Sequence, residues 1–216
     1  MTFQRARSSE AKQQREATIL DAATRLAGRC GIRDITLTDI ADEVGMHKSA
    51  MLRYFETREE IFLRLTAAGW QEWSPAVVEA VDALDPPGEN AVAGVLAGTL
   101  VARPTFCDLL AHAPLNLERN VSVAGVRAFK LVTLAEVARI GDRLRAALPG
   151  LTESDAVLVI AAATSLSGAL WQMATPGPEL RELYRSEPAM AHAVVDVEPQ
   201  VTRMLAAMIR GFLLPA

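Results

Sequence analysis

The chain has 216 residues, of which 50% are hydrophobic and 22% are charged, and its formal net charge is −4. This composition excludes a disordered or collagen-like chain, and the length suits one large domain or two small ones. The net charge by itself indicates no anionic partner, so the placement of the basic side chains matters more than their sum.

The cysteines and the start of the chain bear on the cellular compartment. Cys30 and Cys107 are far apart, and each lies within an apolar helical pattern, so we do not expect a disulfide framework. The opening stretch MTFQRARSSEAKQQRE is polar and basic with no apolar run behind it, so we do not expect a secretory signal. A cytoplasmic protein is therefore expected.

Helix signals recur along the chain without convincing period-two alternation, which predicts an all-α fold. A first helix is expected over residues 11–30, ending at Gly31 as its C-terminal cap. A second helix should begin after Thr36, because Asp39 three residues on completes a capping box. Apolar residues at i, i+3, i+4 and i+7 give this helix one buried face, and Gly45 ends it.

A third helix is expected over residues 48–55, with His47 at its cap and Met51 and Phe55 facing the core. Little more than two turns long, it is unstable alone and gains order from its neighbours. Such a helix suits a narrow space like the DNA major groove. The residues left outside its buried face are Lys48, Ser49, Leu52 and Arg53, with Tyr54 at the border.

A fourth helix should begin at Arg58, because Thr57 and Glu60 have the spacing of a second capping box. Its first turn can also face a DNA backbone, since helix N-termini favour phosphate. These helices predict a helix-turn-helix that presents its second helix to a groove. The alternative is that the basic residues are merely solvated, but their joint placement on one side favours DNA binding.

The stretches TLTDIADEV, GMHKSAMLRYF and ETREEIF follow a pattern of roughly T-x-x-x-I-A-x-x-x-G-V-S-x-x-x-L-Y-x-Y-F and then x-x-K-E-x-L. In this the chain resembles, over about residues 15–65, the DNA-binding segment of the tetracycline-repressor-type (TetR) regulators. Three positions depart from the pattern: His47 replaces a Ser or Thr cap, Leu52 replaces Tyr, and Arg58 replaces Lys. The missing tyrosine affects one DNA contact and not the fold.

The resemblance implies a set of DNA-contacting residues, some on phosphates and some near base edges. The phosphate set is Thr36, Thr38, Lys48, Ser49, Tyr54 and Arg58; Ser49, Leu52 and Arg53 lie nearest the bases, and His47 caps the helix that carries them. Arg5, Arg7 and Lys12 add a basic arm that follows the backbone or minor groove.

We expect residues 1–66 to form the DNA-binding domain, joined by the long fourth helix to a helical ligand-binding and dimerisation domain over residues 67–216. Proline and glycine divide this second part into five or six helices. RPTFCDLLAHAPLNLERNVSVAGVRAFK, residues 103–130, resembles ligand-domain helices of some TetR regulators. The resemblance implies a small, mostly apolar effector; candidate cavity residues, each of which suits a core equally well, are Trp70, Trp73, Phe106, Leu110, His112, Asn116, Asn120, Phe129, Trp171 and Met173.

The uncharged stretch over residues 156–178 is long enough to span a bilayer. Against a membrane anchor stand its Ser, Thr and Gln residues, its many alanines and the acidic residues Asp155 and Glu179 that flank it. A helix that is apolar on all sides also suits a multi-helix core or a subunit interface. We therefore expect no membrane contact, with an anchored regulator as the alternative.

A homodimer is expected, because one short recognition helix covers too few bases to select a site in a genome. The apolar helix over residues 156–174 and the last helix, near residues 201–213, supply surfaces for an isologous four-helix packing. The interface residues predicted from them are Ala161, Ser165, Leu166, Leu205, Met208 and Phe212.

Catalysis is not expected, because His47, His112 and His192 are widely scattered and no hydrolase, metalloprotease or phosphate-loop motif occurs. We accordingly expect no catalytic residue, metal or cofactor. The resemblance implies a ligand-responsive repressor, and we expect a homodimer that binds a palindromic operator and is released when an effector shifts the fourth helix. A helical interaction module without DNA contact is the remaining alternative; it would show no salt-dependent binding to polyanions.

Overall fold

A computed structural model describes residues 2–113 and 117–214, with the side chains of residues 2–9 and 191–192 outside that description. Within these ranges the chain is all-α and contains no strand. In chain order the elements are α1 (Thr2–Cys30), α2 (Leu37–Glu43), α3 (Lys48–Met51), α4 (Arg58–Asp82), α5 (Glu89–Val101), α6 (Pro104–His112), α7 (Val123–Ala147), α8 (Glu153–Ala174), α9 (Pro178–Ser186), a 3-10 helix (Pro188–Ala193) and α10 (Val197–Leu213).

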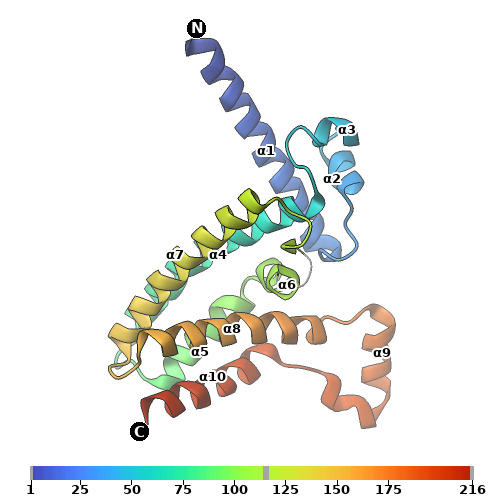
Figure 1. Ribbon diagram of the computed structural model, residues 1–216. Helices are drawn as coiled ribbons and strands as arrows, with labels where there is room; N and C mark the ends of the chain where they lie inside the picture. The colour runs from blue at the N-terminus through green and yellow to red at the C-terminus, as the bar shows by residue number, and fades with distance from the viewer. Residues whose placement is uncertain (1, 114–116, 215–216) are drawn as a thin grey trace.

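Helix α1 is longer than the sequence pattern predicts, because it begins at Thr2 and not near residue 11. Its first turns hold good helix formers and neither proline nor glycine, and an ion pair of 3.8 Å joins Lys12 to Glu16 one turn on. The N-terminal end of α1 projects from the rest of the molecule (Figure 1). The expected basic arm, with Arg5, Arg7 and Lys12, is therefore the start of this helix.

The local signals that delimit α2 are confirmed. The Thr36 hydroxyl accepts a hydrogen bond from the Asp39 amide at 3.2 Å, and the Asp39 carboxylate accepts one from the Thr36 amide at 2.7 Å. Gly31 and Gly45, after α1 and α2, have φ angles of +73° and +65°, in the left-handed region that glycine adopts without strain.

Helix α3 is shorter than predicted. It ends at Met51, and a turn carries the chain on to Phe55, whose amide still donates to the Met51 carbonyl at 3.2 Å. Met51 and Phe55 are fully buried, as expected. The second capping box is half correct, since Thr57 caps α4 by accepting from the Glu60 amide while the Glu60 carboxylate accepts from the Glu56 amide.

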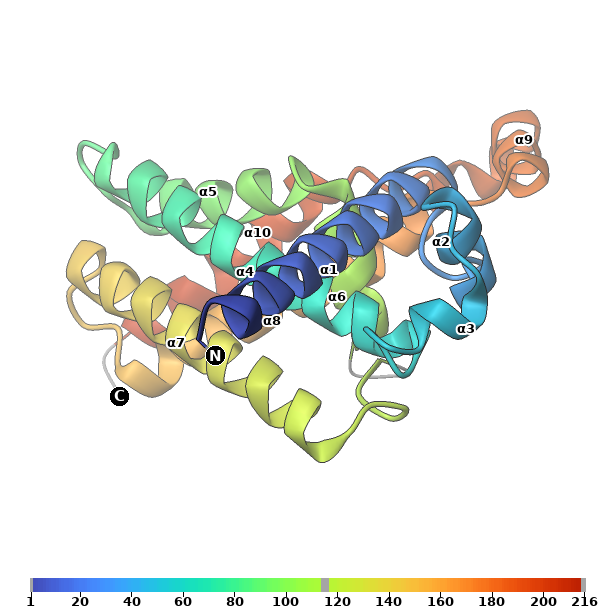
Figure 2. The same cartoon turned by 90° about the horizontal axis from the view of Figure 1, so that it is seen from above.

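Helices α4 to α8 and α10 form one packed body, whereas α9 packs on the 3-10 helix. Helix α4 lies along α7, α5 lies along α10, and α8 packs on α5, α6, α7 and α10 (Figures 1 and 2). Among the described residues α8 is the one single helix long and apolar enough to cross a membrane, and 39% of its most apolar window is buried. Packing on four neighbouring helices buries part of that apolar surface.

Candidate functional site

The tip formed by α2, α3 and the turn after it carries most of the predicted DNA-contacting side chains on its surface. The buried Met51 and Phe55 set the rotation of α3. Tyr54 is half-buried, and the exposed members of the set are Thr36, Thr38, His47, Lys48, Ser49, Leu52 and Arg53. Leu52 is 50% exposed although it is apolar. An apolar side chain between polar ones can contact a thymine methyl group in the major groove.

The basic residues of this region differ in how far they are already paired. Arg25 and Arg29 both reach Glu43, at 3.4 and 2.6 Å, and so tie α1 to α2. Lys48 and Arg53 form no ion pair with any described residue. Arg25 and Arg29 thus have a structural role, whereas Lys48 and Arg53 are available to phosphate or base edges.

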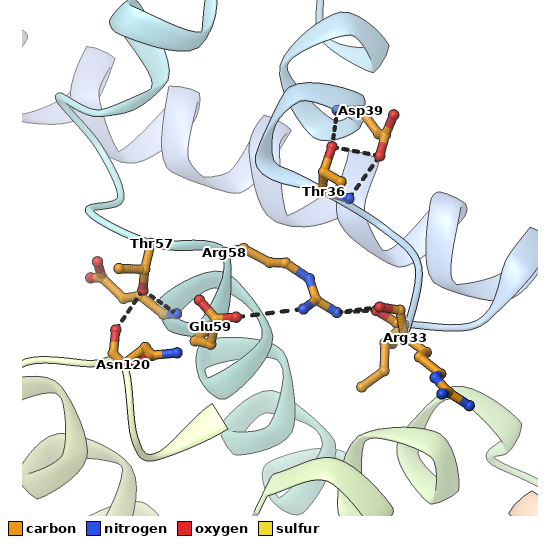
Figure 3. Close-up of polar contacts among 9 residues, drawn as sticks. Arg33, Thr36, Asp39, Thr57, Arg58, Glu59 and Asn120 are labelled. Carbon is orange, nitrogen blue, oxygen red and sulfur yellow. Dashed lines mark hydrogen bonds and ion pairs between the residues drawn. The ribbon is translucent and has the colours of Figure 1, made fainter. Parts of the chain in front are cut away.

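Arg58 does not lie on this surface, which contradicts its predicted phosphate contact. Its guanidinium donates to the backbone carbonyls of Ile32 and, at 3.2 Å, Arg33, and it pairs with Glu59 at 3.4 Å (Figure 3). The side chain is only 24% exposed. Side chains of a helix lean toward its N-terminus, and for Arg58 that direction leads to the loop between α1 and α2. Arg58 therefore fixes this loop to α4.

Asp108 of α6 holds the same loop from the other side. One carboxylate oxygen accepts from the Ile32 amide at 2.8 Å, and the other accepts from the Gln172 side chain of α8 at 2.7 Å. The His112 ring nitrogen Nδ1 lies 2.9 Å from the Asp108 carbonyl and 3.4 Å from its carboxylate. Sequence reasoning missed Asp108, although a lone acid in the apolar helix PTFCDLLAH was a usable signal.

The ionisation of this pair follows from its contacts. Burial acts to raise the pKa of Asp108, but hydrogen bonds from His112, Ile32 and Gln172 outweigh it and hold the pKa below its ordinary value. The hydrogen bond to Asp108 raises the pKa of His112, against the opposing effect of burial. The carboxylate is therefore charged at neutral pH, and the imidazole gains protons more readily than a free one.

Three of the predicted ligand residues form core instead of a cavity wall. Trp70 lies edge-on to Trp73 and to Phe106, with ring centroids 5.4 and 5.9 Å apart, and all three are buried. The Trp73 indole donates to the Thr99 hydroxyl at 2.8 Å. A Cβ atom on Gly69 would lie 2.3 Å from the Phe106 ring, so this ring packs directly against the backbone of α4. These rings fill the region where the cavity was expected.

The other predicted ligand residues are distributed over several places. His112 and Asn120 line a cavity of about 470 Å³, the junction cavity, whose remaining walls are Ile32, Arg33, Arg58, Glu59, Ala111, Leu117 and Gln172. Phe129 lines a second cavity of about 400 Å³ between α4 and α7. Trp171 and Met173 border a broad groove beside α9. Leu110 is half-buried in the core, and Asn116 lies outside the described residues.

The interface prediction is wrong at one position. Leu205 has no exposed surface within a single protomer, because α10 turns it toward α5 and α8. Ala161 and Ser165 are exposed, and Leu166, Met208 and Phe212 are half-buried. The same helices also expose Val157, Leu158 and Met204, which the sequence analysis did not select. Apolar periodicity did not distinguish the outer side of α10 from its inner side, and on α8 it did not identify Val157 and Leu158.

The two cysteines lie in different environments. Burial, together with the neighbouring Asp108 charge, raises the pKa of the Cys107 thiol to about 12. Cys30 is exposed and its thiol donates to the Leu26 carbonyl at 3.3 Å. In the part of the chain that the structure describes, no three His, Cys, Asp or Glu side chains are grouped as metal ligands.

Comparison with known proteins covers both parts of the chain. Residues 67–216 match the family described as "Tetracyclin repressor-like, C-terminal domain", and residues 19–65 match "Bacterial regulatory proteins, tetR family". The chain is 34% identical over 65 residues, 30% of its length, to the uncharacterized HTH-type transcriptional regulator YfiR of Bacillus subtilis (strain 168). That match spans only 32% of the relative.

A solved structure extends the likeness to nearly the whole chain. The crystal structure of the regulatory protein SCO4313 superposes with a TM-score of 0.57, covering 96% of this chain and 98% of that one. The two sequences are 18% identical, so this likeness concerns the fold.

Proposed function

Because the chain belongs to the TetR family of transcriptional regulators, we propose that it acts as a homodimeric repressor, which binds a palindromic operator and is released by a small, mostly apolar molecule. As a member of that family it is a DNA-binding regulator and not an enzyme. We further propose residues 1–66 as the DNA-binding domain, residues 67–216 as the effector and dimerisation domain, and the cytoplasm as its place of action.

The operator proposal rests on the exposed basic side chains of α3 and the turn after it. Lys48 and Arg53 are exposed and without ion pairs among the described residues, and Leu52 is exposed between them in the sequence. In a helix-turn-helix the second helix lies in the major groove, with its first residues toward base edges. We assign Ser49, Leu52 and Arg53 to base edges and Lys48 to a phosphate.

The homodimer proposal rests on the short length of α3 and on exposed apolar side chains. One recognition helix of this length reads too few base pairs, so a second copy is needed for selectivity. Leu158 is 47% exposed on α8 and Met204 is 37% exposed on α10. Exposed apolar groups on two helices that already pack together suit an isologous four-helix contact between protomers.

In vitro selection from random duplex DNA with the full chain, at two salt concentrations, tests the operator proposal. We expect an enriched palindrome whose affinity falls steeply as salt rises, because phosphate contacts release counterions. Failure to enrich any sequence would contradict operator reading. An enriched site without internal symmetry would contradict the homodimer.

A further inference from the structure

The junction cavity lies where the DNA-binding helices meet the larger domain. It is bounded by the α1–α2 loop, the start of α4, the end of α6 and Gln172 of α8. Thr57, at the cap of α4, donates to the Asn120 carbonyl at 2.9 Å across its border (Figure 3). Its volume of about 470 Å³ falls within the range of small-molecule sites. A ligand here would touch both domains at once.

Polar groups that converge on this cavity are only partly satisfied. The Arg58 Nε atom is buried and has no hydrogen-bond partner among the described residues. Arg33 also faces the cavity and has no ion pair with any described side chain. Buried donors are normally satisfied, so this guanidinium nitrogen has a hydrogen-bonding capacity that the described residues leave unused, as Arg103 and Arg143 also do elsewhere.

The charges around the cavity favour an anion. Two arginines line it against one acid, Glu59, which already pairs with Arg58. Asp108 contacts His112, and its two carboxylate oxygens accept hydrogen bonds from the Ile32 amide and the Gln172 side chain. His112 also lines the cavity, and because Nδ1 is used for Asp108, Nε2 becomes a further donor when the ring is protonated.

The rest of the wall is apolar. Ile32 and Leu117 are buried core residues, and Ala111 adds a small side chain at the end of α6. Asn120 and Gln172 are exposed, so the cavity has polar side chains where it meets solvent. A guanidinium group next to an apolar wall suits a molecule with one planar anionic group and a short hydrocarbon body.

We propose that the junction cavity binds a small organic carboxylate, with the carboxylate on Arg58 and an alkyl or aryl body against Ile32, Ala111 and Leu117. The proposal rests on the proposed ligand-responsive function and names the chemical class of its effector. The site differs from the Trp70, Trp73 and Phe106 region expected from the sequence, which is filled by its own rings.

A carboxylate at this position acts directly on the element that orients the DNA-binding helices. The Arg58 guanidinium would exchange the carbonyls of Ile32 and Arg33 for a charged acceptor, and charged acceptors form the stronger hydrogen bond. Of its described polar contacts with α4 and α6, the α1–α2 loop then keeps the bond from the Ile32 amide to Asp108, together with the packing of Ile32 and Ile35 in the core. Ligand and operator would thus favour different positions of that loop, and each would weaken binding of the other.

Calorimetric titration of the full chain with hexanoate and phenylacetate, each beside its uncharged amide, tests the proposal. We expect at least one acid to bind about tenfold more tightly than its amide, since a charge-assisted hydrogen bond is lost with the charge. Arg58→Gln should weaken binding of that acid by about tenfold or more. Arg64→Gln is the matched control, because Arg64 lies on α4 too but lines the other cavity.

Ala111→Phe provides a second variant that leaves Arg58 and its loop contacts intact. It fills the cavity and should abolish acid binding while the protein still selects its operator. The proposal is overturned if neither acid binds or if acid and amide bind equally. It is also overturned if Ala111→Phe and Arg58→Gln bind the acid as tightly as the control Arg64→Gln does. Acid binding that leaves operator affinity unchanged would support the site and contradict release by an effector.

Discussion

Asp108→Ala should destabilise the protein and displace the α1–α2 loop, although Asp108 lies far from the DNA-binding tip in sequence. Asp108 is only 9% exposed, and its carboxylate accepts from the Ile32 amide at 2.8 Å and from the Gln172 side chain at 2.7 Å. Leaving a buried amide without its acceptor costs roughly 1–3 kcal/mol, and loss of the partly buried Gln172 bond adds about 1 kcal/mol. We therefore expect the free energy of unfolding to fall by about 3 kcal/mol.

The pH dependence of that loss follows from the two pKa shifts. The pKa of Asp108 is lower in the folded state, so its stabilisation is present above the unfolded pKa and is lost as pH falls through the folded pKa. The pKa of His112 is raised, so its contribution is present below the unfolded pKa and is lost as pH rises through the folded pKa. Asp108→Ala should lower the free energy of unfolding most in the pH range where both contributions are present, between about pH 4 and pH 6.5.

Urea denaturation followed by circular dichroism, at several pH values, measures this loss. Asp142→Ala is the matched control, because Asp142 also pairs with a basic side chain, Arg145 at 2.6 Å, but is 73% exposed. Its removal should change the free energy of unfolding by at most about 0.5 kcal/mol. A loss below about 1 kcal/mol for Asp108→Ala, or the same loss at every pH, would refute the reasoning.

Three further predictions follow from single residues. Lys48→Gln should weaken operator binding at every sequence and reduce the salt slope by about 1, measured by fluorescence anisotropy; an unchanged slope would remove Lys48 from the phosphate contacts. Gly69→Ala should lower the melting temperature, because its Cβ atom would lie 2.3 Å from a buried ring, whereas Gly94→Ala on α5 meets nothing within 4 Å and should leave it unchanged or higher. Leu158→Asp should give monomers by light scattering while Leu134→Asp on α7 does not; equal masses for the two variants would contradict the α8 interface.

Local signals were predictable from the sequence. The capping box at Thr36 and Asp39, the helix ends at Gly31 and Gly45, and the burial of Met51 all depend on residues close together in the chain. These features determine the helix-turn-helix, so the tip could be assembled before the structure was known. The family resemblance added which of its exposed residues face DNA, and that assignment stays a prediction.

Contacts between distant segments were not predictable. Arg58 sits at a helix start where a phosphate contact was expected, and only the fold shows that the α1–α2 loop carbonyls lie within its reach. The bond from Ile32 to Asp108 joins residues 76 positions apart, so no local pattern predicts it. Leu205 was misassigned because an apolar residue on an amphipathic helix suits a core and an interface equally.

Hydroxyl-radical footprinting of the selected operator tests the central claim most directly, because it reports both DNA contact and the number of recognition helices. We expect two protected patches related by a two-fold axis, with centres about one helical turn or roughly 34 Å apart. Lys48→Gln should weaken protection of both patches equally. A single protected patch, or two patches with no symmetry between them, would contradict a homodimer that reads DNA with α3.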